Sequence, residues 1–471
     1  MIRERTSYDE ALGFAAEKAL DFLRGLDRRP VAATVNEDAL RERLDRPLPD
    51  AGMDPQRAVA RLVDDVDGGL LGSQSGRFFA WVIGGSLPSA LAADWLTAVW
   101  GQNAALYATG PAAAMIEEVV GRWLVSLLPV RASSSFAFVT GSQAAHATCL
   151  AAARHSLLAE RGWDVEMRGL REAPELRVVV NERRHASIDR AVRLLGMGRA
   201  SIVPLEPGSG GTMDPRSLEA ELGRRPGIAT IVALQAGDIN TGTFDDFRTL
   251  VPIAKRHGAW VHVDGAFGLW AGASPSYRHL TAGVQSAHSW AADGHKWRNV
   301  PFDCAYAFVA FPQAHRAAFS IEAPYIAGHA RARDEIDWNP EWSRRARGFA
   351  TYAALLELGR SGVARMVERS CLNARDIVAG IAALPGAEAL WQPVLNQGLV
   401  RFIDVRPGAT QADHDRRTEE VVRAINATGE AFFSTTTWRG MRAMRVSVVN
   451  WQTSETDVER TVAAVRNALA S

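Results

Sequence analysis

The sequence predicts an α/β protein, with a mostly parallel β-sheet in a large domain and a smaller α/β domain at the C-terminus. Short apolar runs, typical of buried strands, alternate with helical patterns from about residue 104 to 320. The pattern changes after about residue 360, where further strands and a closing helix follow. The 471 residues are 47% hydrophobic and 23% charged, which is the composition of a soluble globular protein with a large core.

Residues 1–103 are expected to form an N-terminal arm and helical segment rather than an independent domain. After a charged start, apolar residues at helical spacing predict an amphipathic helix: Leu12, Ala15, Ala16, Ala19, Phe22 and Leu23. Proline-containing breaks follow, and a Gly-rich stretch precedes the apolar segment at 91–100.

Residues 104–360 are predicted to form the large domain and residues 361–471 the small one. The strands expected in the large domain are 136–139, 178–180, 228–234, 260–263 and 305–309, followed by a helical stretch from 343 to about 359. In the small domain we expect strands at 400–403 and 444–449. The closing helix at 453–469 carries a capping pair, Ser454 and Asp457.

Overall charge and cysteine content exclude several classes of function. The 53 basic and 53 acidic residues balance, so there is no global attraction for nucleic acid or an anionic membrane. No stretch holds the ~20 apolar residues of a membrane span. The three cysteines, Cys149, Cys304 and Cys371, are far apart and lack metal-ligand spacing, as expected of free thiols in a reducing compartment. We predict a cytoplasmic protein with no metal site.

A strand leads through a small-residue turn into a helix at Gly141, Ser142 and Gln143. Exposed amides at a helix N-terminus, beside a hydroxyl, suit a phosphate group. Many α/β proteins have a Gly-Ser turn at this place for steric reasons, and on the turn alone that alternative is favoured.

Asp264 stands at the end of its predicted strand, and Ala266 follows two residues later. A carboxylate at this position could hold the nitrogen of a pyridine ring protonated, with Ala266 lying flat under the ring. The alternative, which an isolated Asp-Gly would favour, is that Asp264 caps the next turn.

Lys296 lies between His295 and Trp297. A partly desolvated lysine near other cations is suited to forming a Schiff base, and His295 could donate to a phosphate. The alternative is a surface lysine with a packed stem. The phosphate turn, Asp264 and Lys296 follow one another at loops beyond strands, where open α/β sheets bind ligands. Together they predict a pyridoxal 5'-phosphate (PLP) cofactor.

Four motifs carry a resemblance to a known family: Asp264-Gly265-Ala266, the segment 289–297, Pro301-Phe302-Asp303-Cys304 and Ser343-Arg344-Arg345. From about Gly76 to Trp451 the chain resembles the pyridoxal-dependent decarboxylase family, which contains aromatic amino acid and glutamate decarboxylases. The resemblance implies the PLP-dependent transferase fold (aspartate aminotransferase-like, fold type I) and a homodimer with a shared active site. It also implies an amino acid substrate.

The resemblance also implies roles for single residues. Lys296 matches the Schiff-base lysine and Asp264 the partner of the pyridine nitrogen, while Ser142, Gln143 and His295 match phosphate contacts. His185 matches a histidine stacked on the ring, although a His at a strand-to-helix junction otherwise caps backbone groups. Trp81 and Val82 match the segment that lines the substrate pocket. Arg344 and Arg345 are expected to brace the large domain or the subunit.

Arg445 lies inside an apolar strand and must pair with a charged group. A substrate carboxylate in bidentate contact and a buried structural ion pair are equally plausible partners. Asp238 and Asp293 stand where relatives often carry Thr and Asn. Both add negative charge near the expected cofactor, and either could merely serve hydrogen bonding.

The loop before the Arg-Arg motif departs from the family pattern. Aromatic amino acid decarboxylases carry a tyrosine there that protonates the α-carbon, whereas residues 332–340 contain none and the nearest is Tyr325. Our main hypothesis is decarboxylation of an L-amino acid to its amine through a Lys296 internal aldimine, with Asp264 and His185 assisting. Alternatives on the same scaffold are aminotransfer, decarboxylative oxidation to an aldehyde, and aldolase-type cleavage. A non-catalytic partner is disfavoured, because it would need neither Lys296 nor Asp264.

Overall fold

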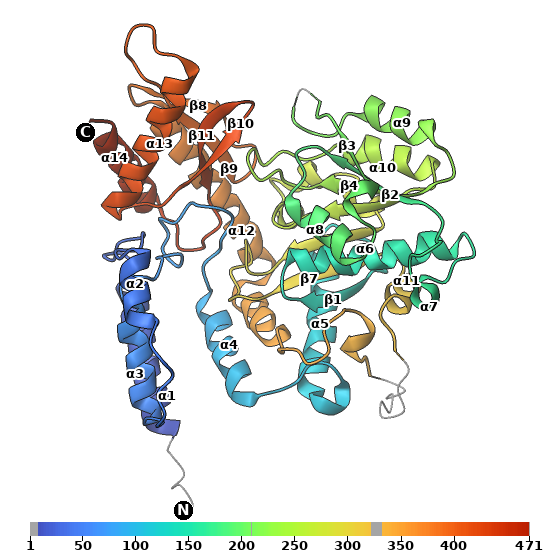
Figure 1. Cartoon of the computed structure of the whole chain (residues 1–471), viewed down its shortest axis with the longest axis horizontal. Coiled ribbons are helices and arrows are strands. Elements are labelled where there is room, and N and C mark those ends of the chain that lie inside the picture. The colour runs from blue at the N-terminus through green and yellow to red at the C-terminus, as the bar shows by residue number, and fades with distance from the viewer. Residues whose placement is uncertain (1–7, 209, 322–331, 471) are drawn as a thin grey trace, which may run out of the picture.

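A seven-stranded β-sheet forms the centre of the molecule (Figure 1). The computed structural model describes residues 8–208, 210–321 and 332–470. The strands lie in the order β1-β7-β6-β5-β4-β2-β3, and only β7 runs antiparallel to its neighbours. Their bounds are β1 Ser135–Val139, β2 Leu176–Asn181, β3 Ile202–Leu205, β4 Ala229–Gln235, β5 Trp260–Asp264, β6 Ser289–Asp293 and β7 Ala305–Val309. The predicted mostly parallel α/β sheet is therefore confirmed.

Helices cover both faces of this sheet, as buried strands require. The helices on one face are α6 Ser142–Ala159, α8 Ala186–Leu194 and α11 Pro312–Ala317; those on the other are α5 Pro111–Leu127, α9 Pro215–Arg224 and α10 Phe247–Arg256. Two further helices are α4 Pro88–Trp100 and the short α7 Val165–Arg168. Alternate strand residues enter the two cores, as Val178 and Val179 illustrate.

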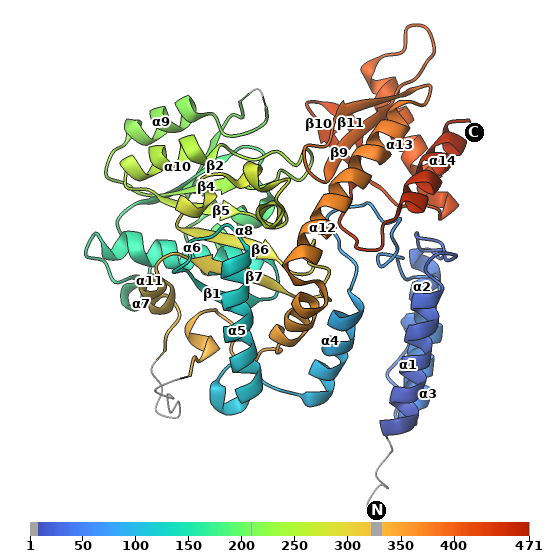
Figure 2. The same ribbon diagram turned by 180° about the vertical axis from the view of Figure 1, so that it is seen from behind.

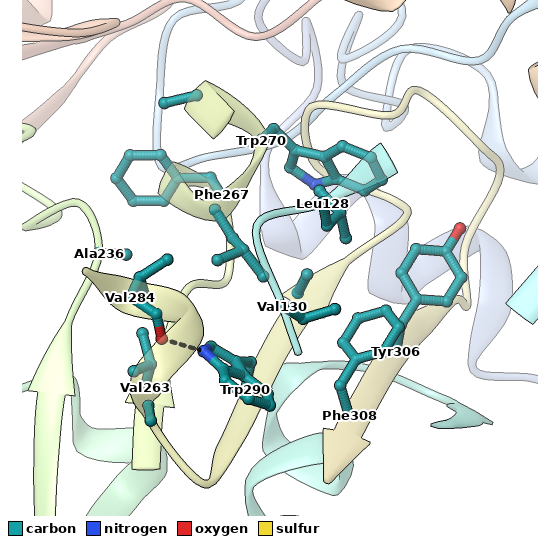
Figure 3. Packing of buried hydrophobic residues seen from close by; sticks show 14 of the residues in the cluster. Leu128, Val130, Ala236, Val263, Phe267, Trp270, Val284, Trp290, Tyr306 and Phe308 are labelled. Atoms are coloured by element: carbon teal, nitrogen blue, oxygen red, sulfur yellow. Dashed lines mark hydrogen bonds between the residues drawn. The ribbon is translucent and has the colours of Figure 1, made fainter. Parts of the chain in front are cut away.

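Several large aromatic side chains pack in the core on the α5 and α10 face (Figure 3). Trp290 of β6 is fully buried, and its indole Nε1 donates to the Val284 carbonyl over 3.0 Å. Tyr306 and Phe308 of β7 lie beside it, and Trp270 stands at the level of the strand ends. Trp270 Nε1 donates to the Asp293 carbonyl over 3.1 Å, so this packing fixes the carboxyl end of β6.

A second sheet of four antiparallel strands follows in the order β10-β11-β9-β8. Its elements are β8 Ala387–Trp391, β9 Gln397–Phe402, α13 Gln411–Thr428, β10 Ser434–Trp438, β11 Met441–Ser447 and α14 Glu455–Ala470. Ser454 and Asp457 form the expected cap of α14, since Ser454 Oγ donates to Asp457 over 2.7 Å. Helix α12, Gly348–Ala382, runs between the sheets and is kinked at Gly359, which has φ 57° (Figure 2). The predicted division at residue 361 falls beside this kink and stays a prediction.

The N-terminal helices α1 Tyr8–Arg24, α2 Glu37–Leu44 and α3 Pro55–Val66 lie together, away from the seven-stranded sheet (Figure 1). Their residues include no fully buried side chain, although α1 and α3 pack against each other. Helix α4 instead packs along α12. Among the helices of the described ranges, none has both the length and the apolar character needed to cross a membrane.

Candidate active site

The carboxyl ends of five strands bring the predicted residues to one edge of the large sheet. Strand β1 leads to Gly141 and β2 to His185, while β4, β5 and β6 lead to Asp238, Asp264 and Lys296. All five strands run in the same direction, so these ends share one edge. Ligands bind outside the carboxyl ends of strands in open α/β sheets.

A cavity of about 410 Å³ opens at this edge. Eight of the predicted residues line it: Gly141, Ser142, Gln143, His185, Asp264, Ala266, His295 and Lys296. The other lining residues are Ala186, Ser187, Arg190, Gln235, Gly237, Ile239, Phe267 and Asp293. Both cationic and carboxylate groups therefore face one space, as a zwitterionic or phosphorylated ligand requires.

The N-terminus of helix α6 forms one end of the cavity. Ser142 Oγ and Gln143 Nε2 are buried there and have no hydrogen-bond partner among residues 8–208, 210–321 and 332–470. Unpaired buried donors beside the first turn of an 18-residue helix suit an anion such as a phosphate. The geometry fits the anion-binding interpretation of the turn.

Lys296 lies over the buried carboxylate of Asp293. Lys296 Nζ is 3.1 Å from Asp293 Oδ2, and the backbone N–H of Ser142 donates to Asp293 Oδ1 over 2.7 Å. Burial raises the pKa of the Asp293 carboxyl, but Lys296 and His295 outweigh that effect and the net shift is downward. Lys296 is thus held at the cavity and does not lie free on the surface.

Asp264 ends β5 with its carboxylate at the cavity. Its Oδ1 accepts from the backbone N–H of Ala266 over 3.2 Å, and its Oδ2 lies 3.5 Å from His146 Nε2. Burial raises the pKa of Asp264, but the opposing effects of His146, His185 and Lys296 leave it below its ordinary value. The carboxylate is ionised, so it can hold a proton on a facing ring nitrogen.

His185 forms the cap expected at a strand-to-helix junction and also faces the cavity, while its stacking on a ring stays a prediction. It is the N-cap of α8, where its Nδ1 accepts from the Ser187 backbone N–H over 3.3 Å and lies 2.8 Å from Ser187 Oγ. Its ring also lines the cavity and is exposed. A cap fixes the ring position, and its exposed face is available to a planar ligand.

Asp238 and Arg445 are not among the residues that line the cavity. Asp238 Oδ1 accepts from the backbone N–H groups of Asn240 and Thr241 over 2.9 and 2.8 Å, so the carboxylate caps the turn after β4. Arg445 is buried in β11, where burial lowers its pKa to about 10 against the opposing charge of Asp238. The Asp238 geometry agrees with a hydrogen-bonding role. Arg445 Nε and Nη2 are buried without a hydrogen-bond partner among the described residues, so a substrate carboxylate and a structural ion pair both stay open for Arg445.

Trp81 and Val82 belong to a segment that passes over the Lys296 backbone. A Cβ added at the nearby Gly84 would lie 2.0 Å from the Lys296 carbonyl oxygen, so only glycine permits this approach. Val82 is buried in the large core, while Trp81 is half exposed and its ring lies 6.1 Å from that of Phe432. Neither side chain lines the cavity of this chain.

The two arginines before α12 anchor the preceding loop, as expected. Arg344 donates to the buried Glu117 carboxylate over 2.8 Å, and Arg345 donates to Asp94 over 2.7 Å. Residues 332–340 pack beside them without a tyrosine. Tyr325 lies outside the described residues.

Sequence analysis did not identify His146 and His262 as parts of the site. His146 lies on α6 and His262 on β5, and both side chains are fully buried. The only sequence signal for this pair was His262 itself, a polar residue inside the apolar run 260–263. A buried polar residue requires a hydrogen-bond partner. The partner comes from a helix more than a hundred positions earlier in the chain, and no local pattern identifies it.

Comparison with known proteins gives consistent matches over most of the chain. The model of the pyridoxal-dependent decarboxylase conserved domain matches residues 39–402. An aromatic-L-amino-acid decarboxylase of Bacillus atrophaeus is 24% identical over 454 residues, 94% of this chain and 92% of that protein. A phenylacetaldehyde synthase of Petunia hybrida is 25% identical over 72% of this chain and 69% of that protein. The crystal structure of Oryza sativa TDC with PLP and tryptamine has TM-score 0.91 at 21% identity, covering 99% of both chains.

Proposed function

Because this chain belongs to the pyridoxal-dependent decarboxylase family, we propose that it removes the α-carboxylate of an L-amino acid and releases the amine. The family's cofactor, PLP, and its reaction class, that of a carboxy-lyase, agree with both sequence-based predictions. We propose the substrate class, and we propose that the α-carbon is protonated after carbon dioxide leaves, which gives an amine.

The observation that carries the proposal is that the Lys296 amine and the ionised Asp264 carboxylate line one cavity with an anion site at its end. Bound PLP supplies an electron sink that stabilises negative charge on the substrate α-carbon. Ser142, Gln143 and the α6 N-terminus would hold its phosphate, Lys296 would supply the amine, and Asp264 would keep the pyridine nitrogen protonated. His185 would stack on the ring.

A second candidate reaction is oxidative decarboxylation to an aldehyde. It is supported by residues 332–340, which carry no tyrosine to return a proton to the α-carbon. Without a prompt proton donor, the carbanionic carbon stays exposed to oxygen for longer. A phenylacetaldehyde synthase is also among the similar proteins.

The two reactions are separated by mass spectrometry of the products formed from a panel of L-amino acids, in air and under nitrogen. We expect the PLP-loaded protein to yield amine and carbon dioxide at equal rates in both atmospheres. Aldehyde, ammonia and hydrogen peroxide formed only in air would support the second candidate. Oxo acids or cleavage products without carbon dioxide would contradict decarboxylation altogether.

We also propose a homodimer, with the N-terminal helices α1 to α3 covered by a second copy. Apolar side chains on these helices are exposed, among them Leu12, Leu20 and Leu62. Light scattering should give twice the 51.1 kDa of one chain. Removing residues 1–66 should shift the measured mass towards that of the monomer. A full chain with the mass of a monomer would contradict the proposal. The cytoplasmic location stays a prediction.

A further inference from the structure

A chain of buried polar groups runs from Asp264 away from the cavity. His146 Nε2 lies 3.5 Å from Asp264 Oδ2, and His146 Nδ1 lies 2.9 Å from His262 Nε2. His262 Nδ1 is then 3.0 Å from Ser289 Oγ, which accepts from Trp260 Nε1 over 2.9 Å. Both histidines and Ser289 are fully buried. We call His146, His262, Ser289 and Trp260 the histidine relay.

The Asp264 end determines the direction of the relay, and the Ser289 end is compatible with it. Trp260 Nε1 can only donate, so Ser289 Oγ accepts there and its own hydrogen is available for His262 Nδ1. Neutral His262 then carries its proton on Nε2 and donates to His146 Nδ1. His146 in turn carries its proton on Nε2, which faces Asp264 Oδ2 over 3.5 Å but has no hydrogen-bond partner among the described residues, so this last contact is electrostatic. The opposite direction would place a lone pair of His146 against the carboxylate, which is repulsive.

Burial keeps both rings uncharged. It lowers the pKa of His262 to about 3 and also lowers the pKa of His146, although Asp264 opposes the latter shift. A charged imidazole beside Asp264 would form an internal ion pair and weaken the pull of the carboxylate on a ring nitrogen. A neutral N–H group that faces the carboxylate favours its ionised form without neutralising it.

We propose that His146 and His262 are positioning residues, which hold the Asp264 carboxylate ionised and aimed into the cavity through a neutral, one-directional relay. The inference rests on the proposed role of Asp264 at the pyridine nitrogen of PLP. It assigns a function to two buried histidines that contact neither the expected cofactor phosphate nor Lys296.

The test compares His146→Leu, which removes the donor, with His146→Gln, which keeps an N–H near the Nε2 position. His315→Leu is the matched control. His315 is also a fully buried histidine, bonded to Ser135 Oγ over 2.8 Å and to the Trp338 carbonyl over 2.7 Å, and it is not linked to Asp264. PLP affinity is measured by titrating the cofactor-free protein, beside its melting temperature and the absorbance of bound PLP.

We expect His146→Leu to weaken PLP binding about tenfold, because the buried Asp264 carboxylate loses the N–H group that faces it. His146→Gln should restore most of the affinity, and His315→Leu should lower the melting temperature without changing the affinity. Equal affinities for His146→Leu and wild type would overturn the relay. So would equal losses in His146→Leu and His315→Leu, since general destabilisation would then explain the effect.

Nitrogen-15 NMR of histidine-labelled, PLP-loaded protein tests the direction independently, with His146→Gln and His262→Gln used to assign the signals. Both rings should be neutral and protonated on Nε2. Protonation of either ring on Nδ1 would overturn the proposed direction. If the wild-type protein fails to bind PLP, the proposed function is wrong. If the wild-type protein binds PLP and the variants of His146 and His262 bind it with the same affinity, only the relay is refuted.

Discussion

Replacing Lys296 with alanine is expected to abolish turnover, lowering kcat by more than about three orders of magnitude. No other amine of the described residues lines the cavity, so the variant has no group to exchange with the substrate amine. The absorbance of lysine-bound PLP should disappear together with activity, while the melting temperature of the cofactor-free protein changes little.

Lys255→Ala is the matched control for this loss. The chain has only three lysines, Lys18, Lys255 and Lys296, and Lys255 lies on α10 outside the cavity. Its replacement should leave kcat and the absorbance of bound PLP unchanged. Normal turnover in Lys296→Ala would refute the assignment of this lysine.

Replacing Asp264 with asparagine should lower kcat by about 10²-fold or more. An amide cannot hold a positive charge on the facing ring nitrogen, so the ring withdraws electrons less well. Steady-state kinetics should place most of the loss in kcat rather than KM. The variant should also release PLP more readily, which dialysis followed by absorbance measures.

The control and the conservative variant separate this effect from general damage. Glu221, on helix α9, is another buried carboxylate, and it pairs with Arg177 of β2 over 3.0 Å. Glu221→Gln should lower stability but leave kcat unchanged. Asp264→Glu, which keeps the charge at a shifted position, should retain more activity than Asp264→Asn, and equal kcat in Asp264→Asn and wild type would contradict the role.

The central strands could be predicted from the sequence because they are apolar on both faces. The predicted strand at 260–263 is β5, and the one at 305–309 coincides with β7. Strands β3 and β10 were not predicted, since β3 has four residues with a proline and β10 is a half-exposed run of Ser and Thr. Strand β6 was not recognised as a strand, because its polar ends, Ser289 and Asp293, shorten the apolar run.

The site could be predicted wherever its residues follow a strand, because strand ends are visible in the pattern. Gly141 and Asp264 are of this kind. Lys296 follows β6, which was not predicted, and it was identified from its neighbours and from the motif at 289–297. Contacts between distant elements could not be predicted. The partner of His262 depends on how α6 packs on β5, and the effect of the Asp238 charge on Arg445 depends on how the two sheets meet.

Peptide mapping after borohydride reduction of the PLP-loaded protein tests the central claim most directly. Reduction fixes PLP to the amine that holds it, and three lysines make the assignment unambiguous. The account predicts the added mass on the peptide containing Lys296, and its loss when an amino acid substrate is added before reduction. An adduct on Lys18 or Lys255, or none at all, would contradict it.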